Sequence, residues 1–303
     1  MKHHLVYLVF IFLVTVLILS TCAPLKPTPI STSTVVPSTP TPISGNIDVG
    51  GYELRIRCAG PGTPTVVVDS GLDDPGAESG PWRSLSSEIA KTTRICLYDR
   101  AGLGGSNPAP GQYEFSRTSQ DMVNDLHTLL VNANVPAPYI LVGNSIGGYN
   151  VRLYAGQYPK DIAGVVLVDS THPDYWSEIL AALPPEESNE PYALQNIRSA
   201  TKPLSNTENM DVIESAAQAR AMKSLGDLPL VVLTRAPGVM IPDLPPDLSA
   251  KIDQIWQDLQ IDLTGLSSNS THIIATQAGH NIAADEPQLV IDAILKVISQ
   301  IKK

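Results

Sequence analysis

The feature that most constrains this chain is the stretch 139–149, which reads Y-I-L-V-G-N-S-I-G-G-Y. Its first half is an apolar run behind two prolines, as expected for a buried strand. Its second half is a G-x-S-x-G pattern around Ser145, and the residues after it predict a helix. A serine on a sharp strand-to-helix turn is held with a strained backbone, and Gly143 and Gly147 leave room for the bend. The alternative is a glycine-rich loop with an incidental serine. The first interpretation predicts a reactive hydroxyl, with the amide of Ile146 placed to donate to an oxyanion.

The composition describes an ordinary globular protein and argues against nucleic-acid binding. Of 303 residues, 43% are hydrophobic and 17% are charged, which is enough for a sizeable core. The formal net charge is −10, and no cluster of Lys and Arg follows the chain as phosphate binding would require. The six His are scattered and the three Cys form no C-x-x-C pair, so no metal is predicted. A Gly-rich turn over 99–106 lacks the last Gly of the dinucleotide-binding pattern, so no cofactor is predicted either.

The N-terminal segment is predicted to lie outside the fold. Residues 5–19 are apolar but too few to cross a bilayer as a helix, and they match the central region of a secretory signal. The run ends at Leu19-Ser20-Thr21-Cys22, which resembles the lipobox of bacterial lipoproteins. We therefore expect a signal peptide over 1–22 and a lipid on Cys22 that holds an exported protein to the outer side of the cytoplasmic membrane. An uncleaved anchor and ordinary secretion are the alternatives, which the intact mass of the native protein would distinguish. Residues 23–44 are rich in Pro, Ser and Thr, which is typical of a disordered tether.

From residue 45 to 303 one domain is expected, in which strands alternate with helices, and this indicates a largely parallel sheet covered by helices. The predicted strands are 52–58, 65–69, 93–99, 140–142, 162–168, 229–234 and 271–276. The predicted helices are 82–91, 119–130, 149–158, 247–259 and 288–301. The core face of the helix 247–259 is predicted from its apolar residues Leu248, Ile252, Ile255 and Leu259. Between about 171 and 226 the alternation stops and prolines interrupt short helices, so a helical lid is predicted after the sixth strand.

Four features in this order make the chain resemble the α/β-hydrolases over about 47–301. They are Ser70-Gly71-Leu72 after the third strand, the turn 99–106, the Ser145 turn, and Ala278-Gly279-His280 followed by Asp285-Glu286-Pro287. The resemblance implies an eight-stranded, mostly parallel sheet and a serine, an acid and a histidine in that order along the chain. It also implies that the amide of Leu72 is the second oxyanion donor.

The resemblance and the chemistry both select His280 as the general base. A serine hydroxyl is a poor nucleophile unless a base takes its proton during attack, and histidine can later return that proton to the leaving group. His172 is the one rival, because it opens the lid, but a lid or pocket-lining role is favoured for it. The expected reaction is hydrolysis of small-molecule carboxylic esters through an acyl-enzyme on Ser145. A peptidase or amidase of the same fold and a non-catalytic cell-surface binding protein are the alternatives. The lid residues Tyr175, Trp176, Tyr192 and Met222 suggest an apolar pocket.

The acid is implied by one branch of the same resemblance. The turn 235–242 after the seventh strand contains no carboxylate, and Asp243 and Asp247 are the nearest. Some members of the haloalkane-dehalogenase branch have a similar apolar Pro-Gly turn and carry the acid after the sixth strand, where this chain has Asp169. The nucleophile here is Ser rather than Asp, so dehalogenation is not implied. The alternative is that Asp169 caps the first turn of the lid and Asp243 is the acid.

The resemblance also implies a disulfide between Cys58 and Cys96. Their strands, the second and fourth, are expected to be neighbours in the sheet, and neighbouring strands lie about 5 Å apart, within reach of a disulfide. Export would make oxidation possible. The alternative is two buried, reduced thiols.

Overall fold

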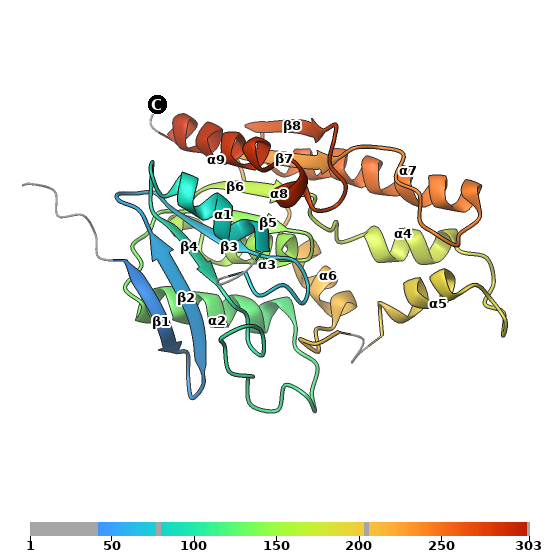
Figure 1. Cartoon of the computed structure of the whole chain (residues 1–303), viewed down its shortest axis with the longest axis horizontal. Coiled ribbons are helices and arrows are strands. Elements are labelled where there is room, and N and C mark those ends of the chain that lie inside the picture. The colour runs from blue at the N-terminus through green and yellow to red at the C-terminus, as the bar shows by residue number, and fades with distance from the viewer. Residues whose placement is uncertain (1–41, 77–79, 203–205, 302–303) are drawn as a thin grey trace, which may run out of the picture. The chain divides into compact units, whose positions relative to one another are not determined.

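The computed structural model describes residues 42–76, 80–202 and 206–301. An eight-stranded sheet runs through them in the order β1-β2-β4-β3-β5-β6-β7-β8 (Figure 1). Its strands are β1 (Ile43–Asp48), β2 (Glu53–Ala59), β3 (Thr65–Asp69), β4 (Ile95–Tyr98), β5 (Tyr139–Asn144), β6 (Ile162–Val168), β7 (Leu230–Arg235) and β8 (Ser270–Ala275). The pairs β1–β2 and β2–β4 are antiparallel, and the other five pairs are parallel. The predicted α/β-hydrolase sheet is confirmed.

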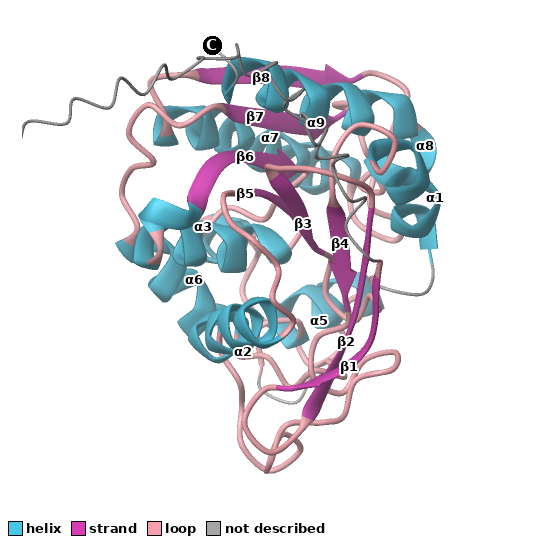
Figure 2. Ribbon diagram, turned by 90° about the vertical axis from the view of Figure 1, so that its left-hand side faces the viewer, coloured by secondary structure: helices cyan, strands magenta, loops and turns pink. Residues whose placement is uncertain are grey.

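Helices cover both faces of this sheet, which explains the continuous apolar runs of its central strands. On one face, Val66 and Val68 of β3 pack with α1 (Gly80–Ile89), α8 (Ile282–Asp285) and α9 (Pro287–Ile301). On the other face, Val67 packs with α2 (Ser119–Asn132) and α3 (Gly147–Gln157). Figure 2 shows these two groups of helices on opposite sides of the strands. Because successive side chains of a strand point to opposite faces, a run of valines supplies both halves of the core.

Three helices lie in the described part of the segment between β6 and β7, where the sequence predicts a lid. They are α4 (Tyr175–Ala182), α5 (Tyr192–Ser199) and α6 (Val212–Ala221). After β7 comes the long helix α7 (Pro246–Leu263), on which α4 packs. We refer to the segment between β6 and β7 as the lid. None of the helices in the described part of the chain is both long and apolar enough to span a bilayer.

The N-terminal edge of the sheet begins earlier than predicted. Strand β1 starts at Ile43, inside the segment 23–44 that the composition assigns to a tether, and Ile43 pairs with Cys58. Its alternating exposure puts Ile43 and Ile47 against the core, a weak pattern that only pairing with β2 makes a strand. The predicted signal peptide 1–22, with Cys22, and most of the predicted tether lie outside the described residues.

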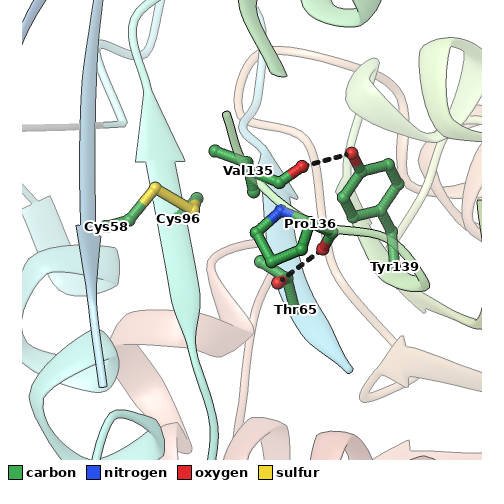
Figure 3. The surroundings of a disulfide bond; sticks show 6 residues. All are labelled: Cys58, Thr65, Cys96, Val135, Pro136 and Tyr139. Carbon is green, nitrogen blue, oxygen red and sulfur yellow. Dashed lines mark hydrogen bonds between the residues drawn. A yellow bond between two sulfur atoms is a disulfide. The ribbon is translucent and has the colours of Figure 1, made fainter. Parts of the chain in front are cut away.

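The predicted disulfide joins β2 to β4. Cys58 and Cys96 are directly opposite in this antiparallel pair, their Cα atoms are 4.0 Å apart, and their sulfurs are bonded (Figure 3). Both residues are buried in the core between the sheet, α2 and α3. The alternative of two reduced thiols is therefore not the state found.

Candidate active site

Ser145 lies on the turn between β5 and α3, at the carboxyl end of the parallel strands. Its φ is 51°, a left-handed conformation that costs energy for a residue with a side chain. Neighbouring backbone groups hold this conformation. The Ser145 amide donates to the carbonyl of Val168 at 3.2 Å, and the Ser145 carbonyl accepts from the amides of Gly148 at 3.0 Å and Thr171 at 2.9 Å.

The two glycines of the motif are needed for close packing around the turn. A Cβ on Gly143 would lie 2.6 Å from a methyl of Val151 on α3. A Cβ on Gly147 would overlap the carbonyl oxygen of Asp69 at the end of β3. A larger residue at either position would push α3 away from the sheet, and Ser145 would move with it.

His280 connects Ser145 to Asp169. Its Nε2 lies 3.0 Å from Oγ of Ser145, and its Nδ1 lies 2.6 Å from Oδ2 of Asp169. His280 stands in the loop between β8 and α8, while Asp169 directly follows β6. With the ring proton on Nδ1, donated to the carboxylate, Nε2 is free to accept the hydroxyl proton. The structure thus brings together the three side chains that the sequence selects.

The other oxygen of Asp169 is held by groups that the sequence reasoning missed. Asp169 is 0% exposed, and its Oδ1 accepts from the backbone amide of Arg235 at 3.0 Å and from Nε1 of Trp256 at 2.9 Å. A buried carboxylate requires such donors. Because both act on Oδ1, the oxygen Oδ2 is left to face His280. The indole of Trp256 also meets the His280 ring edge to face, with centroids 5.4 Å apart.

Next to Asp169 lies an ion pair between Arg235 and Asp253. The guanidinium of Arg235 lies 3.9 Å from Oδ2 of Asp169 and forms its closer ion pair with Asp253 of α7. Asp253 in turn accepts from the amide of Gly238 at 2.6 Å, which ties down the turn after β7. Asp243, the alternative acid, is exposed, and among the described residues it makes no contact with His280.

The two proposed oxyanion donors lie beside Ser145. Ile146 precedes α3 at its N-terminus, and Leu72 follows Gly71, where an added Cβ would lie 3.6 Å from Cβ of Ser145. Leu72, Ile146 and Ser145 border one cavity of about 200 Å³. Within 42–76, 80–202 and 206–301, neither amide donates to another group of the chain. Both N–H groups are therefore available to a ligand.

A second cavity, of about 300 Å³, adjoins Ser145 on the side of His280. Its apolar wall consists of Tyr175, Trp176, Val239, Ile241, Ile252 and Trp256. Ser145, Thr171 and Trp176 border both cavities, so the two spaces lie next to each other. Of the four predicted pocket residues, Tyr175 and Trp176 are in place. Tyr192 and Met222 are not, because Tyr192 is exposed on α5 and Met222 packs into the core beside α3.

His172, the rival base, is engaged elsewhere. Its Nδ1 accepts from the amide of Asp174 at 3.0 Å, and its Nε2 lies 3.0 Å from a carboxylate oxygen of Asp262. Burial lowers the pKa of His172, and the nearby charge of Arg152 lowers it further. A neutral ring with both nitrogens occupied has a structural role, as the sequence interpretation favours.

We expect His172 to make the free energy of unfolding decrease at acid pH. Its folded pKa is lower than its unfolded value of about 6.5, so the unfolded chain takes up the proton first. Stability is therefore complete above that unfolded value and is lost as pH falls through the folded pKa. Urea unfolding of wild type and His172→Gln at about pH 7.5 and about pH 5.5 measures this. Relative to the wild type, the free energy of unfolding of the variant should be higher at the lower pH than at the higher pH. A difference in this free energy between variant and wild type that does not change with pH would contradict the expectation.

Comparison with known proteins agrees with this fold. Residues 64–231 match the model of the alpha/beta hydrolase fold family. The chain is 31% identical over 236 residues to the uncharacterized protein YqjL of Bacillus subtilis, covering 77% of this chain and 83% of that protein. It is similar in structure to alpha/beta hydrolase domain-containing protein 10 from mouse, with a TM-score of 0.61, 17% identity and coverage of 86% of this chain and 99% of the other. A thermophilic esterase from Thermogutta terrifontis gives a TM-score of 0.56 at 18% identity, with 86% and 100% coverage. The chain therefore belongs to the alpha/beta hydrolase fold family.

Proposed function

We propose that this protein is a serine hydrolase that cleaves small-molecule carboxylic esters through an acyl-enzyme on Ser145. One observation carries the proposal: the two contacts of His280, 3.0 Å to Oγ of Ser145 and 2.6 Å to Oδ2 of Asp169. A nucleophile, a base and a buried carboxylate that orients the base form the arrangement that activates a serine.

In the proposed reaction, Nε2 of His280 takes the proton of Ser145 as Oγ attacks the ester carbonyl carbon. The carbonyl oxygen becomes an oxyanion and accepts from the amides of Ile146 and Leu72. Collapse of this intermediate expels the alcohol, to which His280 gives the proton, and leaves an acyl group on Ser145. Water then attacks the acyl group with His280 as base and releases the acid. The carboxylate of Asp169 accepts from Nδ1 of His280 and stabilises the imidazolium.

The two cavities support a substrate with compact apolar groups on both sides of the carbonyl. One cavity adjoins the oxyanion donors, and the other adjoins His280, which must protonate the leaving group. The charged residues in the cavity walls already have partners. Arg235 forms an ion pair with Asp253, and the carboxylate of Asp73 accepts hydrogen bonds from backbone amides of the lid. A neutral ester therefore fits these cavities better than a charged peptide terminus does.

A fluorophosphonate probe tests the proposal because it reacts with an activated serine. We expect the folded wild type to be labelled at Ser145 and to hydrolyse p-nitrophenyl esters. Ser145→Ala should take no label and should lose at least about a thousandfold in turnover. Circular dichroism checks that the variant is folded. Failure of folded wild type to react at Ser145 would favour a non-catalytic binding protein, and faster cleavage of aminoacyl p-nitroanilides than of esters would favour a peptidase or amidase.

A further inference from the structure

A buried ion cluster lies next to the loop that carries Leu72. Arg100, which follows β4, is 3% exposed, and its guanidinium faces Asp69 at the end of β3 and Glu208 in the lid. Nη1 lies 2.7 Å from Oδ1 of Asp69. Nε and Nη2 each lie 2.6 Å from one oxygen of Glu208, a bidentate pair. Glu208 is 1% exposed, so this ion pair is shielded from solvent screening.

The same guanidinium also binds the backbone of the Leu72 loop. Nη1 donates to the carbonyl of Ser70 at 2.7 Å, and Nη2 donates to the carbonyl of Gly71 at 2.6 Å. The Gly71 carbonyl and the Leu72 amide belong to one planar peptide unit. A hydrogen bond that holds the carbonyl therefore sets the direction of the N–H at its other end, and it also polarises that N–H toward a better donor.

The next peptide unit is held from the lid. The amide of Asp73 donates to Oε1 of Glu208 at 2.8 Å. In return, Oδ1 of Asp73 accepts from the amides of Thr207 at 2.9 Å and Glu208 at 3.3 Å. Leu72 thus has one neighbouring peptide held by Arg100 and the other by Glu208.

The cluster is costly as a purely structural device. It holds two carboxylates and one guanidinium out of water, and buried charges are often replaceable by apolar residues without loss of stability. Burial raises the pKa of Asp69, which needs Tyr98, Asn150 and Arg100 as donors. Arg100 makes five hydrogen bonds, one for each N–H of its guanidinium. This complete use of a rigid fork indicates a requirement for geometry.

We propose that Arg100 and Glu208 are positioning residues that orient the Leu72 amide as an oxyanion donor, and that the lid completes the oxyanion hole through Glu208. The inference rests on the proposed hydrolase function. The lid then has two duties, since it borders the substrate cavities through Trp176 and aligns the loop opposite them through Glu208.

Two variants separate positioning from folding. Glu208→Gln keeps the shape and can still accept from the Asp73 amide, but it loses the charge-assisted pair with Arg100. Arg100→Lys keeps the charge but has too few donors to bind both carboxylates and both carbonyls. For each variant we expect kcat on a p-nitrophenyl ester to fall by about 10- to 100-fold with KM nearly unchanged. Inhibition by phenylboronic acid, which forms a tetrahedral adduct on Ser145, should weaken by a similar factor.

Glu190→Gln is the matched control. Glu190 is another buried lid carboxylate, and its Oε2 lies 3.1 Å from Nε of Arg198. This pair borders neither of the two cavities beside Ser145. Its loss should therefore affect stability and leave kcat and boronic acid affinity unchanged. Titration with the fluorophosphonate probe counts reactive Ser145, so kcat is expressed per folded site even where a variant is partly unfolded. An active wild type whose Arg100 and Glu208 variants keep normal kcat would overturn the inference alone. An equal loss in Glu190→Gln would also overturn it. A wild type that neither labels nor hydrolyses esters would refute the proposed function itself, and the inference with it.

Discussion

Asp169→Asn should lower ester turnover by about four powers of ten while the protein stays folded. The reason lies in the donors around this carboxylate. The Arg235 amide and the Trp256 indole both donate to Oδ1, so the amide oxygen of Asn would take that place. Its NH₂ group would then face Nδ1 of His280, which must become an acceptor. The ring proton would move to Nε2, and His280 would no longer accept the proton of Ser145.

The measurement is kcat/KM on a p-nitrophenyl ester, with circular dichroism to confirm the fold. Asp243→Asn is the control, because Asp243 is exposed and should tolerate the change with little effect. The rate of fluorophosphonate labelling should fall together with turnover in Asp169→Asn, since both need the same activated hydroxyl. Near-normal activity in Asp169→Asn with loss in Asp243→Asn would show that Asp243 is the acid.

Removal of the disulfide should lower the free energy of unfolding by about 4 kcal/mol without changing kcat. Cys58 and Cys96 are 38 residues apart in sequence, and closing a loop of that length restricts the unfolded chain. Both cysteines are replaced by alanine, in Cys58→Ala/Cys96→Ala, rather than by serine. Both positions are buried, and a serine hydroxyl there would need a hydrogen-bond partner. Urea unfolding of the oxidised wild type and the variant gives the difference.

The control is reduction of the protein. A thiol reductant should destabilise the wild type and leave the double variant unaffected, which separates the bond from any other effect of the substitutions. In denatured, unreduced wild type, neither thiol should react with an alkylating agent. Alkylation of both thiols, or a double variant as stable as the oxidised wild type, would contradict the prediction.

Much of the fold follows from local patterns in this chain. The predicted bounds of β3 and β6 agree with the structure residue for residue, because each is a short apolar run ended by a polar residue and buried on both faces. The turn at Ser145 is equally local, since the two glycines and the following helix are contiguous with it. His280 follows instead from the family resemblance together with the chemistry of a general base, and Asp169 follows from the resemblance alone.

Helix α7 shows where such reasoning fails. Three residues of its predicted apolar face pack against the lid: Ile252 is buried there, with Leu248 and Ile255 beside it. The fourth, Leu259, is only half-buried and lies outside this cluster. A second buried face, with Asp253, Trp256 and Gln260, turns toward the ends of β6 and β7. It binds Arg235, Asp169 and the Ser170 carbonyl. Hydrophobic periodicity cannot identify polar residues that are buried because distant residues of the fold satisfy their hydrogen bonds.

Pairing between distant segments was decided by the tertiary structure alone. Arg100 and Glu208 are 108 residues apart, and each by itself has the sequence context of an ordinary charged surface residue. The strand order brings the end of β4 next to the end of β3. The lid then places Glu208 against Arg100, which follows β4, and against the amide of Asp73, which follows β3. The sequence by itself determined strands β2 to β8 and the serine turn, because strand periodicity and turn chemistry are local, and the family resemblance added the candidate histidine and carboxylate. Only the folded chain decided which charges meet and which amides stay free, because these depend on distances between residues that no local pattern connects.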